Sequence, residues 1–354
     1  MTDNIVKIEK TILALKNGTN KFYFFVQDTK GNPKASIKYI YDLANALKQN
    51  GKNAIILFEE KGYTSHKTWL GEGYEDLEEN YVNGQNLQVG VEDFLIIPEL
   101  LGYIIEQVQN LPCGKIILTQ AYDHVFETLK PGQSWNGFGV YKCLTTSEIL
   151  AEKVRDIFRS VSVDVLPVPL SKYATEKDKP AKPIIAIHSR EQRDSLNLIK
   201  IFYQKYPQYR WFTFRDMRSM NQDQFYEPLR DACVSVWIDE KSSFGTYPLE
   251  SMSVGTPVIG RIPYIEPEWI NEKNGIWTTN NFDLVDILAE YIKNWLEDNV
   301  SETLIQEGLD TAKKYQNHEE FVTLSNKLFQ EYVSNRVESL EQQLDKLKPV
   351  EAEL

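Results

Sequence analysis

The sequence predicts an α/β protein made of two halves, each a parallel sheet with helices. Three observations support this prediction. Short apolar runs alternate with amphipathic segments along most of the chain, which is the pattern of βαβ units. A stretch with four prolines, from Pro167 to Pro183, separates two such series and indicates a linker between domains. The length of 354 residues is sufficient for two ordinary domains, each with its own core.

Apolar runs of strand length predict the first sheet. The expected strands are Phe22–Gln27, Ala54–Phe58, Phe94–Ile97, Lys115–Thr119, Tyr141–Thr145 and Val163–Val168. The expected helices between them are Lys34–Asn50, Leu101–Gln109 and Ser147–Phe158. In the first helix, Ile37, Ile40, Ala44 and Leu47 fall on one face, and Gly51 is placed to end it.

The second half repeats this pattern after the linker. Its expected strands are Ile184–Ser189, Trp211–Asp216, Val234–Asp239, Pro257–Gly260 and Ile276–Thr278, with helices over Asp194–Tyr206 and Gln222–Ala232. Two such halves predict two Rossmann-like domains that face a cleft. In sheets of this kind ligands bind beyond the carboxyl ends of the strands.

The remainder of the chain, from Phe282, is expected to be mainly helical. Apolar residues recur at alternating spacings of four and three, at Val333, Val337, Leu340, Leu344 and Leu347. This seam is only about two heptads long. It leaves two alternatives, a helix packed on its own protein and a helix through which two copies associate.

Composition and charge exclude several classes of protein. A formal net charge of −12 argues against a general nucleic-acid binder, which needs basic surface. The three cysteines, Cys113, Cys143 and Cys233, are widely spaced, fit neither a zinc site nor a disulfide framework, and favour a reducing compartment. The first residues lack the apolar stretch of a signal peptide, and no run approaches the ~20 apolar residues of a membrane helix. We expect a cytoplasmic protein.

The segment from Ser242 to Gly260 (SSFGTYPLESMSVGTPVIG) carries the strongest functional signal. It is expected to form a glycine loop, a short helix and a buried strand. Pro248 suits the first helical position, and Gly255 is placed to end the helix. A helix that starts from a glycine loop presents N–H groups to an anion such as a diphosphate. Glu250 is expected in the first turn, within reach of a sugar or ribose hydroxyl.

These residues carry a family resemblance. The pattern F-G-x-x-x-x-E-x-M-x-x-G-x-P-V-I, followed by Asn274-Gly275, resembles the donor-binding segment of GT-B glycosyltransferases, most of all the retaining group related to glycosyltransferase family 4. The resemblance implies that Glu250 holds the ribose hydroxyls of a nucleotide sugar. It also implies that Gly245, Thr246 and Tyr247, after Phe244, offer backbone N–H groups to the sugar and diphosphate.

The resemblance extends to an arginine after the first strand of the second half. In the family, this arginine and a lysine five residues later bind the donor diphosphate. Arg190 matches the arginine, whereas the lysine position falls on Ser195, so Arg193 is a displaced substitute. The alternative for such an arginine is a solvated charge or an ion pair with Glu191 or Asp194. Arg261 is a spare candidate.

The chain departs from the family pattern at Ser242. The family has two glutamates separated by seven residues, and the first of them falls on Ser242. A serine offers one hydrogen bond to a sugar but no charge, although Asp239 or Glu240 could supply a displaced carboxylate. Three alternatives follow: a different donor sugar, weakened catalysis, or a protein without activity.

Two further positions in the first half match the family approximately. His124, after the strand Lys115–Thr119, corresponds to a histidine that faces the reacting sugar, and Asp123 is a candidate beside it. A lone histidine is more often structural. The segment Gln27–Ser36 matches the family's loop after the first strand, with a plain surface turn as the alternative.

Together these features predict a metal-independent glycosyltransferase with a cytoplasmic location. The resemblance implies an acceptor domain over residues 1–168, a donor domain over 169–300, and C-terminal helices over 301–354 that partly return to the first domain. The partners would be a nucleotide-sugar donor and a saccharide, glycolipid or protein-linked acceptor, with polysaccharide biosynthesis as the setting and peripheral contact with the inner membrane face as an option. No cofactor is expected. The alternative is an inactive GT-B-like protein that binds a sugar or another glycosyltransferase.

Overall fold

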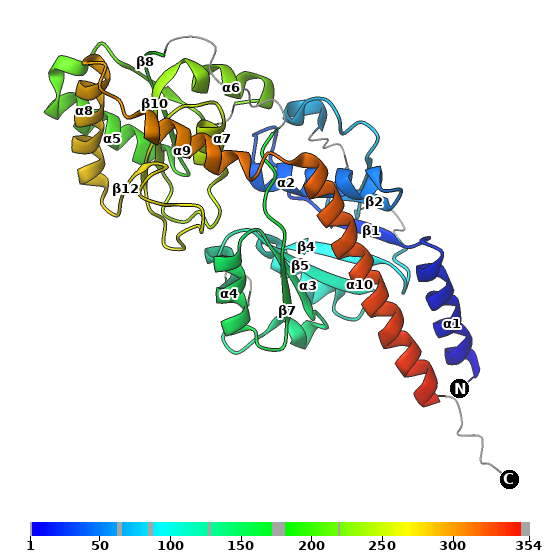
Figure 1. Cartoon of the computed structure of the whole chain (residues 1–354). Helices are drawn as coiled ribbons and strands as arrows, with labels where there is room; N and C mark the ends of the chain where they lie inside the picture. The colour runs from blue at the N-terminus through cyan, green and yellow to red at the C-terminus, as the bar shows by residue number, and fades with distance from the viewer. Residues whose placement is uncertain are drawn as a thin grey trace.

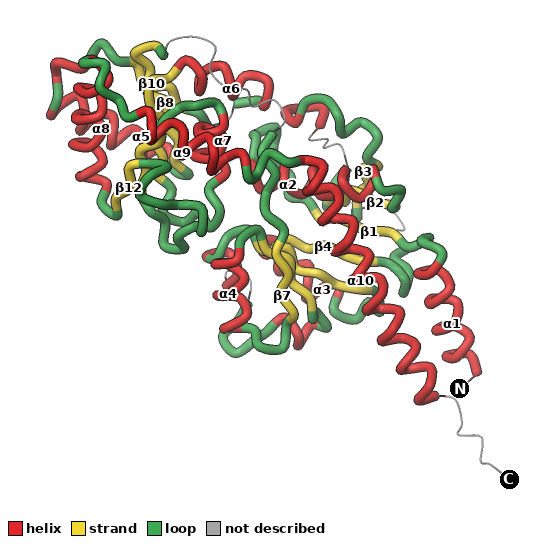
Figure 2. Tube along the Cα trace, in the orientation of Figure 1, coloured by secondary structure: helices red, strands yellow, loops and turns green. Residues whose placement is uncertain are grey.

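The computed structural model describes residues 2–61, 66–83, 88–126, 129–171, 181–218 and 220–347. They form two α/β domains, each built on one sheet in which every strand pairs in parallel with its neighbours (Figures 1 and 2). Residues 172–180, which make up much of the expected linker, lie outside the described residues.

The first sheet has seven strands in the order β3-β2-β1-β4-β5-β6-β7. Their bounds are β1 Lys21–Phe25, β2 Asn53–Phe58, β3 Glu78–Tyr81, β4 Phe94–Pro98, β5 Gly114–Thr119, β6 Lys142–Thr145 and β7 Ser162–Val165. The α-helices of this half are α1 Thr2–Lys16, α2 Ala35–Gln49, α3 Gly102–Val108 and α4 Glu148–Ile157. Short helical turns occur at η1 His66–Leu70, η2 Glu99–Leu101, η3 Asp123–Phe126 and η4 Trp135–Phe138.

The second sheet has five strands in the order β12-β11-β10-β8-β9. Their bounds are β8 Lys182–Ser189, β9 Thr213–Asp216, β10 Ala232–Ile238, β11 Val258–Arg261 and β12 Ile276–Thr278. The α-helices are α5 Gln192–Lys205, α6 Gln222–Asp231, α7 Thr246–Ser253, α8 Asn281–Leu296, α9 Glu302–Lys313 and α10 His318–Leu347, with a short turn at η5 Pro207–Tyr209.

The central strands consist of residues that suit burial on both faces. All five residues of β4 and all seven of β10 are buried, in agreement with their continuous apolar sequences. Ser147 is the N-cap of α4, because its side chain accepts a hydrogen bond from the N–H of Leu150. Gly255, at φ +73°, follows the end of α7 as expected.

The last helix, α10, leaves the second half and packs against α1 and α2 of the first (Figure 1). Val333, Val337, Leu340 and Leu344 are buried, and they belong to a core cluster that also contains residues of α1 and α2. The apolar seam of α10 therefore packs against helices of the same chain. Association of two copies through this helix stays an untested alternative.

Four features differ from the expectations. Helix α7 begins at Thr246, so Pro248 is its third residue and Glu250 its fifth, beyond the first turn. The helix starts earlier because Gly245, at φ +75°, already turns the chain. Helix α1 and strand β3 were not expected. Strand β3 is EENY, which lacks the apolar signal of a buried strand and is only half-buried.

Within the described residues, no helix combines the length and the apolar character that a membrane crossing requires. The three cysteines are buried, and within the described residues they form no disulfide.

Candidate functional site

The carboxyl ends of the two sheets face each other and enclose a cavity of about 630 Å³. From the first half, the segment after β1, the start of α2 and the segments after β4 and β5 line it. From the second half, the ends of β8 and β10, the segment after β9 and the loop before α7 line it. A cavity between two domains, at the carboxyl ends of parallel strands, is where ligands bind in such folds.

The loop before α7 can only be built with a glycine at position 245. Gly245 has φ +75°, and a Cβ there would lie 2.8 Å from Cη2 of Trp237 and 3.0 Å from Cζ2 of Trp269. The indole N–H of Trp269 donates to the carbonyl of Phe244 at 2.6 Å, which fixes the loop from the other side. The loop is thus held in one conformation, with Ser242, Phe244, Gly245 and Thr246 at the cavity.

Glu250 lines the cavity from α7. The hydroxyl of Tyr226 donates to its Oε1 at 3.2 Å. Burial raises the pKa of Glu250 to about 7, against the opposing effect of Lys38 of α2 and of the Tyr226 hydrogen bond, while Asp42 raises it further. The carboxylate has few fixed partners, so hydroxyl groups of a ligand could satisfy its remaining oxygen lone pairs.

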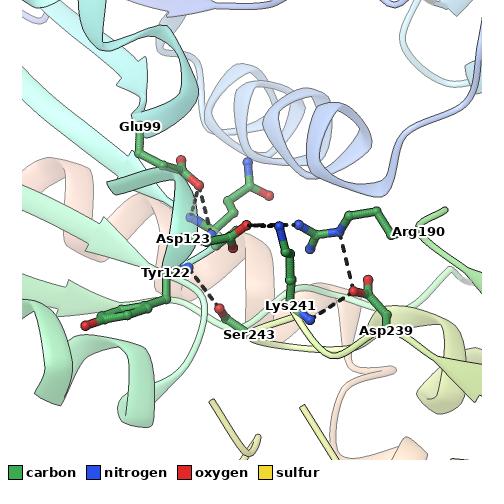
Figure 3. A network of polar contacts seen from close by, with 9 residues as sticks. Glu99, Tyr122, Asp123, Arg190, Asp239, Lys241 and Ser243 are labelled. Carbon is green, nitrogen blue, oxygen red and sulfur yellow. Dashed lines mark hydrogen bonds and ion pairs between the residues drawn. The ribbon is translucent and has the colours of Figure 1, made fainter. Parts of the chain in front are cut away.

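Arg190, directly after β8, joins the two halves (Figure 3). Its Nη1 lies 3.3 Å from Oδ2 of Asp123, and its Nε lies 3.4 Å from Oδ1 of Asp239. Lys241 adds a longer ion pair to Asp123, at 4.0 Å. Burial raises the pKa of the Asp239 carboxyl, and Arg190 opposes that rise. Arg190 therefore pairs with Asp123 and Asp239 rather than with the alternative partners Glu191 and Asp194.

The segment after β5 is held by a carboxylate that sequence reasoning missed. Oε1 of the buried Glu99 accepts hydrogen bonds from the backbone N–H groups of Gln120, at 3.0 Å, and Ala121, at 2.8 Å (Figure 3). Burial raises the pKa of Glu99 to about 7, although both backbone bonds and His124 oppose the rise. The N–H of Tyr122 then donates to Oγ of Ser243, at 3.0 Å, which ties this segment to the second half.

The lining of the cavity also contains an imidazole and a second arginine. His188 lines the cavity, and its ring stacks on that of Tyr247, with centroids 4.7 Å apart. Arg218 lines the cavity as well, and its Nε lies 3.0 Å and 3.2 Å from the two carboxylate oxygens of Asp216. Burial alone would raise the pKa of Asp216, but the bonds from Arg218 outweigh it and lower that pKa.

Two helices point their N-terminal ends at the cavity. Lys34, the N-cap of α2, and Gly245, the N-cap of α7, both line it, and neither supplies a side-chain cap to its helix. Partial positive charge collects at such helix ends. The lining also contains Lys38, Arg190 and Arg218, but each is ion-paired with a carboxylate. The two helix ends are therefore the feature that suits the cavity to an anion.

Most residues predicted for the site reach the cavity. Those in its lining are His124, Arg190, Ser242, Phe244, Gly245, Thr246, Tyr247 and Glu250. Asp123 joins the site through its ion pair with Arg190. Arg193 is exposed on α5 and is not among the residues that line the cavity.

The other candidate positions differ in whether they reach the cavity. Asp239 lines the cavity. Glu240 instead forms an ion pair with Arg261, with Oε2 of Glu240 lying 2.6 Å from Nη2 of Arg261. Ser195, at the family's lysine position, is buried and lies 2.5 Å from Oγ of Ser189. Of the segment Gln27–Ser36, Gln27 and the residues from Asn32 onward line the cavity.

Sequence reasoning missed Glu99, His188, Arg218 and Lys38 of α2 as site residues. One signal could have found three of them. Glu99, His188 and Arg218 each fall within two residues of the carboxyl end of a strand in a parallel sheet, where the ligands of such folds gather.

Comparison with known proteins gives structural relatives only. No protein-family model matches the sequence, and no curated protein sequence matches it either. Solved structures do match over most of the chain. Sucrose-phosphate synthase from Thermosynechococcus elongatus is 11% identical over 89% of this chain and 100% of that one, with a TM-score of 0.63.

Two further structures contain ligands. The pneumococcal O-GlcNAc transferase GtfA, in complex with UDP and GlcNAc, is 9% identical over 90% of this chain and 99% of that one, with a TM-score of 0.64. Anabaena Alr3699/HepE, in complex with UDP, is 12% identical over 89% of this chain and 100% of that one, with a TM-score of 0.60. The chain thus has the GT-B fold, two parallel-sheet domains with a cleft between them.

Proposed function

We propose that this protein is a glycosyltransferase that moves a sugar from a nucleotide-sugar donor to a saccharide, glycolipid or protein-linked acceptor. The observation that carries the proposal is the position of Glu250, whose carboxylate lines a cavity of about 630 Å³ that Arg190 and the start of α7 also line. Structural neighbours bound to UDP support a UDP-sugar as the first donor to test.

Each group has a role that its chemistry supports. Glu250 would accept hydrogen bonds from the ribose hydroxyls, which an ionised carboxylate binds well. Arg190 would bind the diphosphate, together with the backbone N–H groups at the start of α7. The negative charge that develops on the leaving diphosphate would be met by these cationic and dipolar groups, so we propose a reaction that needs no metal ion.

The first half would hold the acceptor. His124 faces the cavity from the segment that Glu99 fixes, close to the ion pair between Asp123 and Arg190. We propose residues 1–168 as the acceptor domain and 169–300 as the donor domain, with closure of the cleft excluding water from the anomeric carbon. Retention of configuration is proposed from the resemblance to family 4.

One observation favours a second candidate function, binding without turnover. Ser242 lines the cavity at the position where the family has a glutamate, and the nearby carboxylate that reaches the cavity, Asp239, is paired with Arg190. A protein with this arrangement could bind a nucleotide sugar, or serve as the partner of an active transferase, without transferring the sugar.

A thermal-shift screen with UDP, GDP and dTDP tests the shared claim, that the cavity binds a nucleotide. A ligand of the folded state raises the melting temperature as its concentration exceeds its dissociation constant. Release of UDP from UDP-glucose and UDP-GlcNAc, measured with a coupled assay, then separates the two functions. Release at a rate above that of a Glu250→Ala variant supports the transferase, and binding without release supports the second candidate. No shift with any nucleotide would contradict both.

A further inference from the structure

His188 is a cavity residue whose place follows from its strand. It is the last but one residue of β8 and lies opposite Trp237 of β10 in the sheet register. Side chains two apart on a strand share a face, so His188 and Arg190, directly after the strand, are directed to the same side. His188, Arg190 and Trp237 all line the cavity.

The imidazole is held in one orientation. It stacks on Tyr247 with an interplanar angle of 22°. Tyr247 is fixed in turn, because its hydroxyl accepts from Oγ of Ser235 at 2.6 Å, and Oγ of Ser251 donates to its carbonyl at 3.0 Å. The two serine hydroxyls are 2.9 Å apart. The stacking on Tyr247 thus sets the plane of the imidazole ring beside the cavity.

The two ring nitrogens differ in their surroundings. Nδ1 of His188 is shielded from solvent and has no hydrogen-bond partner in the described part of the chain. A buried N–H without a partner is rarer and less favourable than a buried lone pair. The proton of the neutral ring therefore belongs on Nε2, the nitrogen left to face the cavity. The same argument disfavours the imidazolium form, which would place a second N–H on Nδ1.

Electrostatics agree with a neutral ring. Burial lowers the pKa of His188 to about 4; Asp216 opposes this, and Arg218 and Arg190 add to it. At neutral pH the side chain is thus a single hydrogen-bond donor without charge. It lies in the field of two arginines that already have carboxylate partners, Arg190 with Asp123 and Asp239, and Arg218 with Asp216.

We propose that Nε2–H of His188 donates a hydrogen bond to a phosphoryl oxygen of the bound nucleoside diphosphate. This inference rests on the proposed function. The guanidinium groups of Arg190 and Arg218 line the same cavity, and no acceptor among the described residues takes the Nε2–H of His188. A phosphoryl oxygen is the acceptor that fits, because a neutral donor and an anionic acceptor form a charge-assisted bond.

Two variants of His188 test the contact. His188→Phe keeps an aromatic ring on Tyr247, fills a similar volume and removes the donor, whereas His188→Gln keeps an N–H close to the position of Nε2. We expect His188→Phe to weaken UDP binding about tenfold, since a hydrogen bond to a charged group is lost. We expect His188→Gln to retain most of the affinity. Uridine, which lacks phosphate, should bind the wild type and His188→Phe equally.

Isothermal titration with UDP, and NMR titration with the weaker ligand uridine, give these affinities. If UDP binds the wild type and His188→Phe with equal affinity, or if uridine loses as much affinity as UDP, the phosphate contact is overturned while the proposed function stands. If UDP does not bind the wild type at all, the proposed function itself fails.

The imidazole ¹⁵N spectrum gives an independent test, because the chain has only four histidines and the variants identify the signals of His188. We expect the neutral Nε2–H tautomer at pH 7 and a change of the Nε2 shift when UDP is added. The Nδ1–H tautomer, or an Nε2 signal unaffected by saturating UDP, would overturn the assignment.

Discussion

Nη1 of Arg190 lies 3.3 Å from Oδ2 of Asp123, so a cation at the end of β8 is paired with a carboxylate that follows β5 in the other half. The same guanidinium contacts Asp239. Two carboxylates thus occupy the arginine that we propose for the diphosphate. A nucleotide must displace or share them, and Asp123 is the partner that lies across the cleft.

Replacement of Asp123 should therefore tighten nucleotide binding. In Asp123→Asn the diphosphate competes for Arg190 with one carboxylate, Asp239, instead of two. A partly exposed ion pair contributes ~1 kcal/mol or less, so we expect a two- to fivefold lower dissociation constant for UDP. Asp231→Asn is the matched control, because Asp231 has a similar exposure (25% against 29%), pairs with Lys182 and lies outside the cavity. Unchanged or weaker UDP binding in Asp123→Asn would show that Asp123 and the diphosphate do not compete for Arg190.

Two glycines separate the effect of backbone conformation from that of packing. Gly245 and Gly255 have similar φ angles, +75° and +73°. A Cβ at Gly245 would approach Trp237 to 2.8 Å, whereas at Gly255 the nearest atom is 4.0 Å away. Both alanine variants should lose ~1–2 kcal/mol for the left-handed conformation. Gly245→Ala should lose a further ~1–3 kcal/mol through overpacking and bind UDP less tightly.

Urea unfolding and UDP titration of both glycine variants check this prediction. Gly255→Ala should keep the wild-type affinity, because it lies outside the cavity. Equal stability losses in the two variants would mean that the loop before α7 adjusts around an added methyl group.

Glu99 should make stability depend on pH. Its pKa is about 7 in the folded protein against 4.5 in the unfolded chain. Its contribution to stability is therefore fully present below pH 4.5 and is lost as the pH rises through 7. Glu99→Gln keeps the oxygen that accepts from Gln120 and Ala121 but carries no charge. We expect it to exceed the wild type in stability at pH 8 by an amount on the order of 1–3 kcal/mol.

Urea unfolding at pH 4.5, 6 and 8 measures this difference. The gain of Glu99→Gln over the wild type should grow between pH 4.5 and 7 and then level off. A difference that stays constant over this range would show that the carboxyl group is not buried as the structure has it.

The sequence predicted the fold better than the site. Buried parallel strands such as β4 and β10 have continuous apolar sequences, so periodicity located them within one or two residues. Strand β3 is half-buried and polar, and only its pairing with β2 makes it a strand. Local patterns carry no information on such a pairing.

In the site, too, residues within one sequence motif could be predicted, whereas contacts between separate segments could not. Glu250 and Gly245 lie in one contiguous motif, and a resemblance found them. Arg190 was found as well, but its partners Asp123 and Asp239 come from separate segments that meet only in the folded chain. His188 was missed because a histidine in an apolar run resembles a buried strand residue, although its place near the carboxyl end of β8 was a signal. Its significance lies in an Nδ1 that has no hydrogen-bond partner among the described residues, which is a property of the packing.

The central claim is that UDP binds in the cavity through Glu250, and calorimetric titration of two alanine variants tests it most directly. Glu250→Ala removes the carboxylate from the cavity, while Glu272→Ala removes an exposed glutamate of the same half that lies outside it. We predict that UDP binds the wild type and Glu272→Ala alike. Its affinity for Glu250→Ala should fall at least about tenfold, the cost of a hydrogen bond to a charged group. Undiminished affinity in a folded Glu250→Ala protein would contradict the proposed site.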